Sequence, residues 1–200
     1  EFENVCNNGC TFSAFIYPTI LRGTIIGRSD SSENNEFFKL STDGLGRLSF
    51  YISPEGINKC LITSTNTLVL NTWHNVAASF NKETRQIKIY DNGVQVANTI
   101  TCWTPITNIN AASWSKSENT FIGTHDDNSW RDGFNGVIDE VLVFSRVLSD
   151  SEIKSIYDAR GTSQYYQTFS SVPNGVHTYT GYIIDAAGNV TSDTRSITID

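Results

Sequence analysis

Apolar and polar residues alternate with a period of two along much of the first 147 residues. In residues 11–18 (TFSAFIYP), Phe12, Ala14 and Ile16 share one side of the segment. This alternation indicates a half-buried β-strand, because successive strand side chains point to opposite faces. Residues 36–52 repeat the pattern on either side of a predicted turn. We therefore expect antiparallel strands joined by short turns.

The clearest hairpin lies in residues 85–97 (RQIKIYDNGVQVA). Its Asn92-Gly93 pair tolerates the positive φ angles that a tight type I′ turn requires. Ile87 and Ile89 share one strand face, and Lys88 and Tyr90 share the other. Several short strands joined in this way predict an all-β sandwich.

One helix is predicted near residues 150–159. Ser149 and Glu152 fit the S-x-x-E capping box, in which each side chain binds the other residue's backbone N–H. Leu148 and Ile153 stand at the two positions of a hydrophobic staple across that cap. Ile153 also begins an apolar face with i, i+3, i+4 spacing.

The character of the chain changes after Gly161. Residues 170–200 alternate apolar and small polar residues, with two predicted turns. Some three strands cannot bury a core of their own, because small isolated sheets are marginal in water. They either pack on the first domain or form part of a second sandwich. We therefore divide the chain into a sandwich, residues 1–160, and a small β segment, residues 161–200.

Composition narrows the class of protein. Hydrophobic residues make up 38% of the 200 residues and charged residues 18%, which suits a folded extracellular β protein. The formal net charge is −7, and no Lys/Arg cluster occurs, so we expect neither nucleic acid nor an anionic membrane as partner. No apolar run is long enough to span a membrane, so we expect no membrane insertion.

The four cysteines have no metal-binding or redox spacing, which favours two disulfides in an oxidising compartment. Three pairings are possible. We favour Cys60–Cys102, which would tie two strand segments together, and Cys6–Cys10, which would close a small N-terminal loop. We therefore expect a secreted or cell-surface protein.

Taken together and in order, several segments resemble the laminin-G-like, concanavalin A-like lectin/glucanase superfamily over roughly residues 10–160. The matching segments are residues 11–18, Ile25–Arg28 (IIGR), Trp73–Val96 with its Y-x-N-G hairpin, Phe121–Gly123 (FIG) and the closing G-x-I-D-E-V strand and helix of residues 134–157. The resemblance implies a β-sandwich jelly roll with one short helix. Separately, residues 165–199 resemble the closing strands of the immunoglobulin-like repeats of large microbial surface proteins, with YIIDAAGNV (residues 182–190) at their D-x-x-G-N turn.

Asp139 and Glu140 are adjacent carboxylates in an apolar segment, an arrangement that suggests a glycosidase acid/base pair. Strand alternation predicts that they project to opposite faces, Asp139 with Val141 and Glu140 with Ile138. A glycosidase needs its two carboxyl groups on either side of one bond. We therefore expect a structural role for the pair and no catalytic residues.

The preceding loop, residues 124–133 (THDDNSWRDG), is rich in oxygen donors. Calcium binds six to eight oxygens of carboxylates, amides and carbonyls. Asp126, Asp127, Asn128 and Asp132 are therefore candidate calcium ligands, although a solvated turn without metal explains the same composition. The resemblance favours calcium, because members of the superfamily often carry it.

Aromatic side chains could stack on sugar rings. Trp73 lies in a core-strand motif, which favours packing as its role. Trp103, Trp114 and Trp130 lie in predicted loops beside polar residues, and Trp130 is the first candidate because Arg131 and several acids neighbour it. A loop tryptophan that packs on its own fold is the alternative.

These observations predict a non-catalytic carbohydrate-binding or adhesion module of a larger surface protein, with carbohydrate or a surface protein as partner and calcium as a candidate cofactor. The alternative is a structural spacer or assembly unit whose C-terminal strands pair with neighbouring domains of the parent protein or with another subunit, since unpaired strand edges invite partners.

Overall fold

The structure is a computed structural model, and it describes residues 5–6, 8–29, 36–53, 60–102, 119–124, 133–159, 172–184 and 190–199. The chain forms two compact units, residues 1–161 and residues 162–200.

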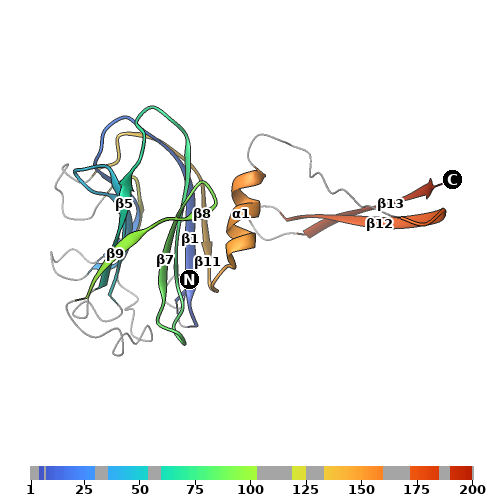
Figure 1. The fold of residues 1–200 in the computed structure, drawn as a ribbon, viewed down its shortest axis with the longest axis horizontal. Helices are drawn as coiled ribbons and strands as arrows, with labels where there is room; N and C mark the ends of the chain where they lie inside the picture. Colours follow the sequence, from blue (N-terminus) through green and yellow to red (C-terminus); the bar gives the residue numbers. More distant parts are fainter. Residues whose placement is uncertain are drawn as a thin grey trace. The chain divides into compact units, whose positions relative to one another are not determined.

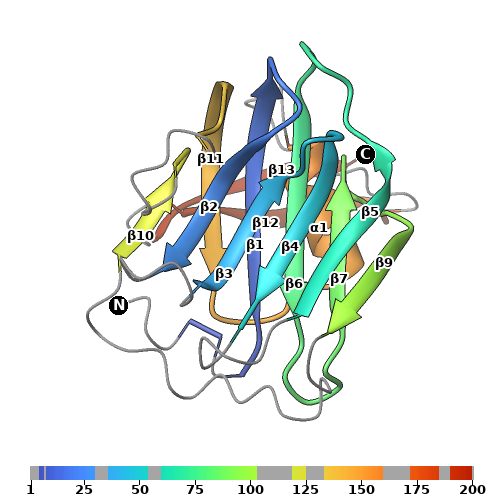
Figure 2. The ribbon, with the colours of Figure 1, turned by 90° about the vertical axis from the view of Figure 1, so that its left-hand side faces the viewer.

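Two antiparallel sheets form the first unit. The five-stranded sheet has the order β11-β1-β6-β7-β8, with bounds Gly136–Phe144 (β11), Cys10–Pro18 (β1), His74–Phe80 (β6), Ile87–Asp91 (β7) and Val94–Gln95 (β8). The six-stranded sheet has the order β10-β2-β3-β4-β5-β9, with bounds Asn119–Ile122 (β10), Gly23–Ser29 (β2), Glu36–Thr42 (β3), Arg47–Ile52 (β4), Cys60–Thr67 (β5) and Asn98–Cys102 (β9). Figure 2 shows the six-stranded sheet in front of the five-stranded one. The β-sandwich predicted from the alternating pattern is confirmed.

The core lies between the two sheets and is formed mainly by buried apolar residues of β1 to β7. Phe12 of β1 is fully buried, and its ring lies 4.3 Å from the ring of Phe38 and 5.7 Å from that of Phe50. Burial of aromatic and aliphatic side chains from both sheets supplies the main stabilisation of such a sandwich.

The helix α1, Asp150–Asp158, lies on the outside of the five-stranded sheet (Figure 1). Its predicted capping box is present: the Glu152 N–H donates to Ser149 Oγ at 3.2 Å, and the Ser149 N–H donates to Glu152 Oε2 at 2.8 Å. Leu148 and Ile153 are buried in one cluster with Ala77 of β6, which completes the hydrophobic staple.

The predicted hairpin joins β7 to β8. Asn92 and Gly93 have φ angles of 53° and 75°, as a type I′ turn requires. A side chain at position 93 would also meet Lys154 and Tyr157 of α1 at about 3.0 Å, so glycine there permits the helix to pack on the turn.

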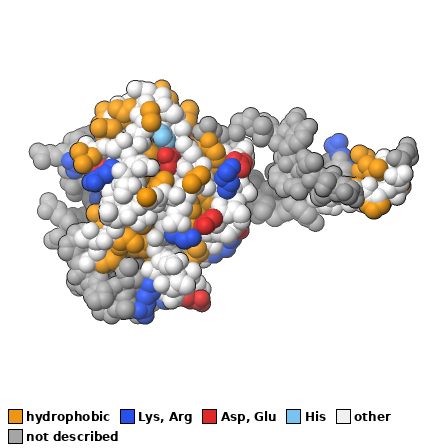
Figure 3. Space-filling model, viewed as in Figure 1, with side chains coloured by type: hydrophobic (Ala, Val, Ile, Leu, Met, Phe, Trp, Pro, Cys, Tyr) orange, Lys and Arg blue, Asp and Glu red, His pale blue; other side chains and the backbone are white. Residues whose placement is uncertain are grey.

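Both disulfides that the sequence analysis favoured are present. Cys6 is bonded to Cys10, and Cys60 of β5 to Cys102 of β9, where the two residues pair directly across the strands. Basic and acidic side chains intermingle on the face shown in Figure 3. Among the residues described, no helix is long and apolar enough to cross a membrane.

The second unit contains an antiparallel ribbon of β12, Gly175–Ile184, and β13, Val190–Ile199. Hydroxyl pairs bridge the strands on one of its faces, Thr178 with Ser196 and Thr180 with Thr194. Val176 and Ile197 are exposed, at 71% and 51%.

Candidate functional site

A β-bulge interrupts β11 at the two acids. Ser13 of β1 pairs with Leu142 and Phe15 pairs with Asp139, so two residues of β11, Glu140 and Val141, stand opposite one residue of β1. Glu140 has a φ of 46°, and its backbone N–H donates to Asp139 Oδ1 at 2.8 Å. The extra residue shifts the strand's alternation by one position.

The shifted alternation corrects the orientation predicted for the acids. Ile138 and Val141 were expected on opposite faces, yet both pack against the core between the sheets. Asp139 and Glu140 are both exposed, and both line one hollow on the outside of the five-stranded sheet. The predicted separation of the two carboxylates is therefore wrong. A regular alternation rule cannot foresee a bulge, because the bulge arises from pairing with a distant strand.

The hollow has a volume of about 370 Å³ and is lined, among the described residues, by Phe15, Trp73, Asp139 and Glu140; we call it the outer-face hollow. Phe15 pairs with Asp139 across the strands and is nearly buried. Trp73 is 38% exposed, and its ring centroid lies 5.7 Å from that of Tyr17, with the ring planes tilted by 57°.

Packing was the role expected for Trp73, and its ring does pack against Tyr17, but it does so on the outside of the sheet and 38% of the residue stays exposed. It immediately precedes β6, whose Val76 and Ala78 point inward and are fully buried. Residue 73 is separated from these inward residues by an odd number of positions, so its side chain lies on the opposite, outer surface of the sheet. The sequence signal that could have indicated this is the spacing between Trp73 and the inward residues of β6.

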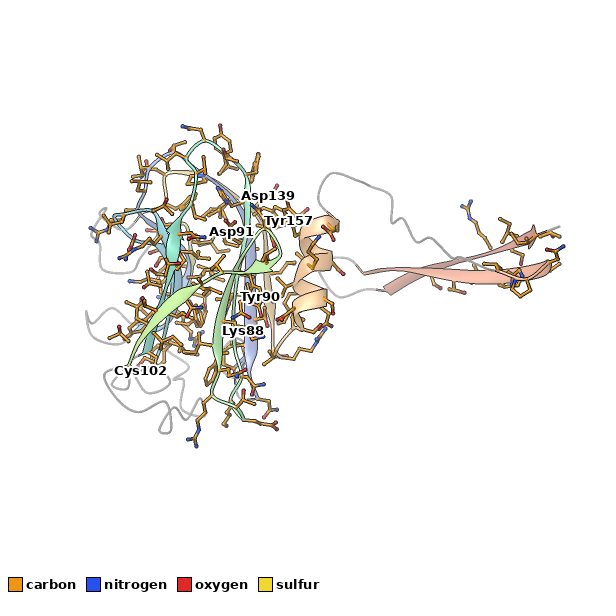
Figure 4. The ribbon with its side chains drawn as sticks, in the orientation of Figure 1. Lys88, Tyr90, Asp91, Cys102, Asp139 and Tyr157 are labelled. Carbon is orange, nitrogen blue, oxygen red and sulfur yellow. A yellow bond between two sulfur atoms is a disulfide. The ribbon has the colours of Figure 1, made fainter. Side chains whose placement is uncertain are left out.

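The loop that carries Trp73 is held at both ends. His74 is buried, its Nδ1 lies 2.9 Å from Asp91 Oδ1, and its Nε2 lies 3.2 Å from the Val69 nitrogen. The Asn71 N–H donates to the Pro18 carbonyl at 2.8 Å. These contacts tie residues 69–73 to the ends of β1 and β7 and fix the position of the indole. Figure 4 shows Asp91 and Asp139 towards the same end of the sheet.

The outer-face hollow combines an aromatic surface with carboxylate acceptors. One oxygen of Asp139 is engaged by the Glu140 backbone, whereas the Glu140 carboxylate accepts no hydrogen bond from the residues that the structure describes. No lysine or arginine is among the described lining residues. An aromatic face packs against apolar C–H groups, and ionised carboxylates accept hydrogen bonds from hydroxyl or ammonium groups.

A larger hollow, of about 600 Å³, lies where α1 begins. There Asp150 Oδ1 accepts hydrogen bonds from Tyr90 Oη at 2.8 Å and from Lys88 Nζ at 3.1 Å. Figure 4 labels Tyr90 and Lys88 on β7. The bond from Tyr90, and then that from Lys88, lowers the pKa of Asp150, while burial and the bond to Asp150 raise that of Tyr90. These groups are paired with one another, so they serve to hold the helix on the sheet.

Residues 1–154 match the family described as the concanavalin A-like lectin/glucanases superfamily. The chain belongs to this superfamily. No curated protein matches the chain in sequence. The match ends before β12, so it does not extend to the second unit, whose predicted immunoglobulin-like character stays a prediction.

Solved structures share the fold of this superfamily member at low sequence identity. A heptameric SAP-like pentraxin from Limulus polyphemus has a TM-score of 0.58 and 14% identity, over 95% of this chain and 82% of that one. The CBM40 of Ruminococcus gnavus IT-sialidase, bound to α2,3-sialyllactose, has a TM-score of 0.59 and 18% identity, over 76% and 84%. Botulinum neurotoxin type C, whose cell entry depends on two ganglioside molecules, has a TM-score of 0.54 and 20% identity, over 78% and 37%.

The loop residues predicted for this lectin/glucanase-like sandwich lie outside the described residues. They are the glycan candidates Trp103, Trp114, Trp130 and Arg131 and the calcium candidates Asp126, Asp127, Asn128 and Asp132. Within the described residues, no group of three or more His, Cys, Asp or Glu is placed to hold a metal ion.

Proposed function

We propose that this chain is a non-catalytic carbohydrate-binding module and that the outer-face hollow is a glycan site. The observation that carries the proposal is the exposed indole of Trp73 beside two surface carboxylates. A pyranose presents C–H groups on its faces and hydroxyl groups around its edge, which suits an aromatic platform with acceptors at its side. Membership of the lectin/glucanases superfamily supports the proposal, as do the carbohydrate ligands of proteins with a similar fold.

Recognition suits the hollow better than hydrolysis. Two catalytic carboxyl groups must flank a glycosidic bond from its two sides. Asp139 and Glu140 are consecutive residues of β11 at the bulge, so both approach a bound sugar from the same strand. One oxygen of Asp139 is also engaged by the backbone of that bulge.

The direct test is a Trp73→Ala variant in a glycan array, followed by calorimetric titration with the best ligand. Loss of the aromatic platform is expected to weaken binding about tenfold or more. Val94→Ala is the matched control, because Val94 is 60% exposed on the same sheet and lies outside the hollow. Unchanged affinity of Trp73→Ala, or no ligand on the array, would refute the site.

Trp130, with Arg131 beside it, remains the loop alternative as a glycan platform. Trp130→Ala in the same titration separates the two sites, because only the variant that removes the true platform loses affinity. Calcium remains a second part of this proposal, supported by the oxygen donors of residues 126–132. If it binds there, a chelator lowers the melting temperature of the protein and has no such effect on Asp126→Asn/Asp127→Asn.

A second candidate function is assembly through the C-terminal ribbon. The supporting observation is that β12 and β13 pair only with each other among the described strands, while Val176 and Ile197 are exposed. Such a ribbon is marginally stable alone, and its open edges can accept a strand of a neighbouring domain or subunit. Sedimentation of the chain with and without residues 162–200 tests this: association should disappear with the deletion, and two monomers would refute it.

We also propose an extracellular location, in a secreted or cell-surface parent protein. The two disulfides support it, because such bonds form and persist mainly in oxidising compartments. Labelling of intact source cells with an antibody to this unit is the test, and staining only after permeabilisation would count against it.

A further inference from the structure

The negative charge of Asp139 and Glu140 affects which glycans can bind in the outer-face hollow. Asp139 and Glu140 are exposed carboxylates on one side, and no described lining residue is basic. The whole chain is also acidic, with a formal net charge of −7. A sugar that carries a carboxylate or sulfate would meet two like charges there, and none of the described lining residues would supply a cation to pair with it.

Acidic sugars are commonly held by arginine, whose planar guanidinium binds a carboxylate through two hydrogen bonds. Sialyllactose, the ligand of the similarly folded CBM40, carries such a carboxylate. The described lining offers the opposite chemistry, since its two charged residues, Asp139 and Glu140, are both acidic.

A protonated amine, in contrast, can interact favourably with the described acids and with the tryptophan of the hollow. It can donate hydrogen bonds to the Asp139 oxygen that does not bind the Glu140 backbone and to the Glu140 carboxylate. It is also attracted to the face of a tryptophan, and Trp73 presents its exposed indole beside the acids. We infer that the hollow selects glycans with free amino groups, such as de-N-acetylated hexosamine oligomers, over neutral ones and rejects acidic ones. This inference rests on the proposed function of the hollow as a glycan site.

The test is calorimetric titration of the whole chain with three probes: glucosamine hexamer, its fully N-acetylated counterpart and 3′-sialyllactose. Near pH 6 an ordinary amine is protonated and carboxylates are ionised. The glucosamine oligomer is then positively charged, its acetylated counterpart is neutral and sialyllactose is negatively charged. We expect the glucosamine oligomer to bind at least about fivefold more tightly than the acetylated one, and sialyllactose not to bind. Raising the salt to about 0.5 M should reduce the preference, because exposed charges are screened.

The matched variant is Asp139→Asn/Glu140→Gln. Asparagine retains an oxygen that can accept the hydrogen bond from residue 140, so the bulge is expected to persist while both charges are lost. The ratio of the affinities for the amino and the acetylated oligomer should fall to about one in this variant.

The outcomes separate the inference from the proposed function. If neutral and amino oligomers bind equally, or sialyllactose binds best, and Trp73→Ala abolishes binding, the glycan site stands and the selectivity is overturned. A preference that persists in the charge-neutral variant also overturns it. If no probe binds and the array finds no ligand sensitive to Trp73, the proposed function itself fails.

Discussion

The carboxylate of Asp139 accepts a hydrogen bond from the backbone N–H of Glu140 at 2.8 Å, within a bulge where Glu140 adopts a φ of 46°. This local contact stabilises a left-handed conformation that costs a non-glycine residue about 1 kcal/mol or more. Its result is that two consecutive carboxylates share one surface with Trp73. The bulge is thus the structural basis of the outer-face hollow.

The conformation of residue 140 can be tested by substitution. Glu140→Gly is expected to leave the free energy of unfolding unchanged or slightly higher, because glycine adopts positive φ without a Cβ clash. Glu140→Val should lower it by about 1–3 kcal/mol, since a β-branched residue is disfavoured there. Urea denaturation measures both, with Glu140→Gln as the control for loss of charge. Equal stability of the glycine and valine variants would contradict the bulge.

His74 is predicted to position Trp73 through the loop of residues 69–73. His74→Ala removes a buried imidazole together with its contacts with Asp91 and Val69, so we expect a loss of about 1–3 kcal/mol in stability. Glycan affinity should fall as well, because binding must then order the indole, while fluorescence of the free protein reports a more mobile Trp73. His177→Ala, in the second unit, is the control. Normal affinity and stability of His74→Ala would show that the loop is held by other contacts.

The capping box of α1 predicts a pH dependence. The Arg146 guanidinium, followed by the backbone and hydroxyl of Ser149, lowers the pKa of Glu152 from 4.5 to about 2. Because the folded-state pKa is depressed, the contribution of Glu152 is present above about pH 4.5 and is lost as the pH falls towards 2.

The difference in unfolding free energy between the wild type and Glu152→Gln should therefore shrink through that acidic window. Chemical denaturation at a series of pH values measures it, and Glu83→Gln, at an exposed turn, serves as the control. A difference that stays constant between pH 4.5 and 2 would refute the assignment.

The two disulfides are expected to stabilise the sandwich unequally. Cys60 and Cys102 are separated by 42 positions and join the edge strand β9 to β5, whereas Cys6 and Cys10 are separated by 4. Loop-closure entropy predicts a contribution of about 4 kcal/mol for the longer loop and about 2 kcal/mol for the shorter. Unfolding of the paired Cys→Ala variants in urea measures each, and a larger loss from the Cys6/Cys10 pair would contradict the expectation.

Much of the framework could be predicted from local pattern. The hairpin at Asn92-Gly93 and the cap at Ser149 follow from residues that act over a few positions, since turn type and capping are decided by short-range backbone requirements. The site could not be predicted in the same way. The motif around Trp73 indicates a packing role, and its ring packs on Tyr17. Only the tertiary arrangement shows that this contact lies on the outer surface beside the two acids.

The amino-acid pattern is enough to predict a sandwich of short antiparallel strands, its helix and its hairpins, because periodicity and turn residues encode which face of each segment is buried. That Asp139 and Glu140 lie together depends on the folded arrangement of the strands. That relationship depends on the pairing of β11 with Ser13 and Phe15 of β1, far away in the chain, where one extra residue must be accommodated. A bulge depends on the register between two strands, and register is set by the packing of the whole sandwich.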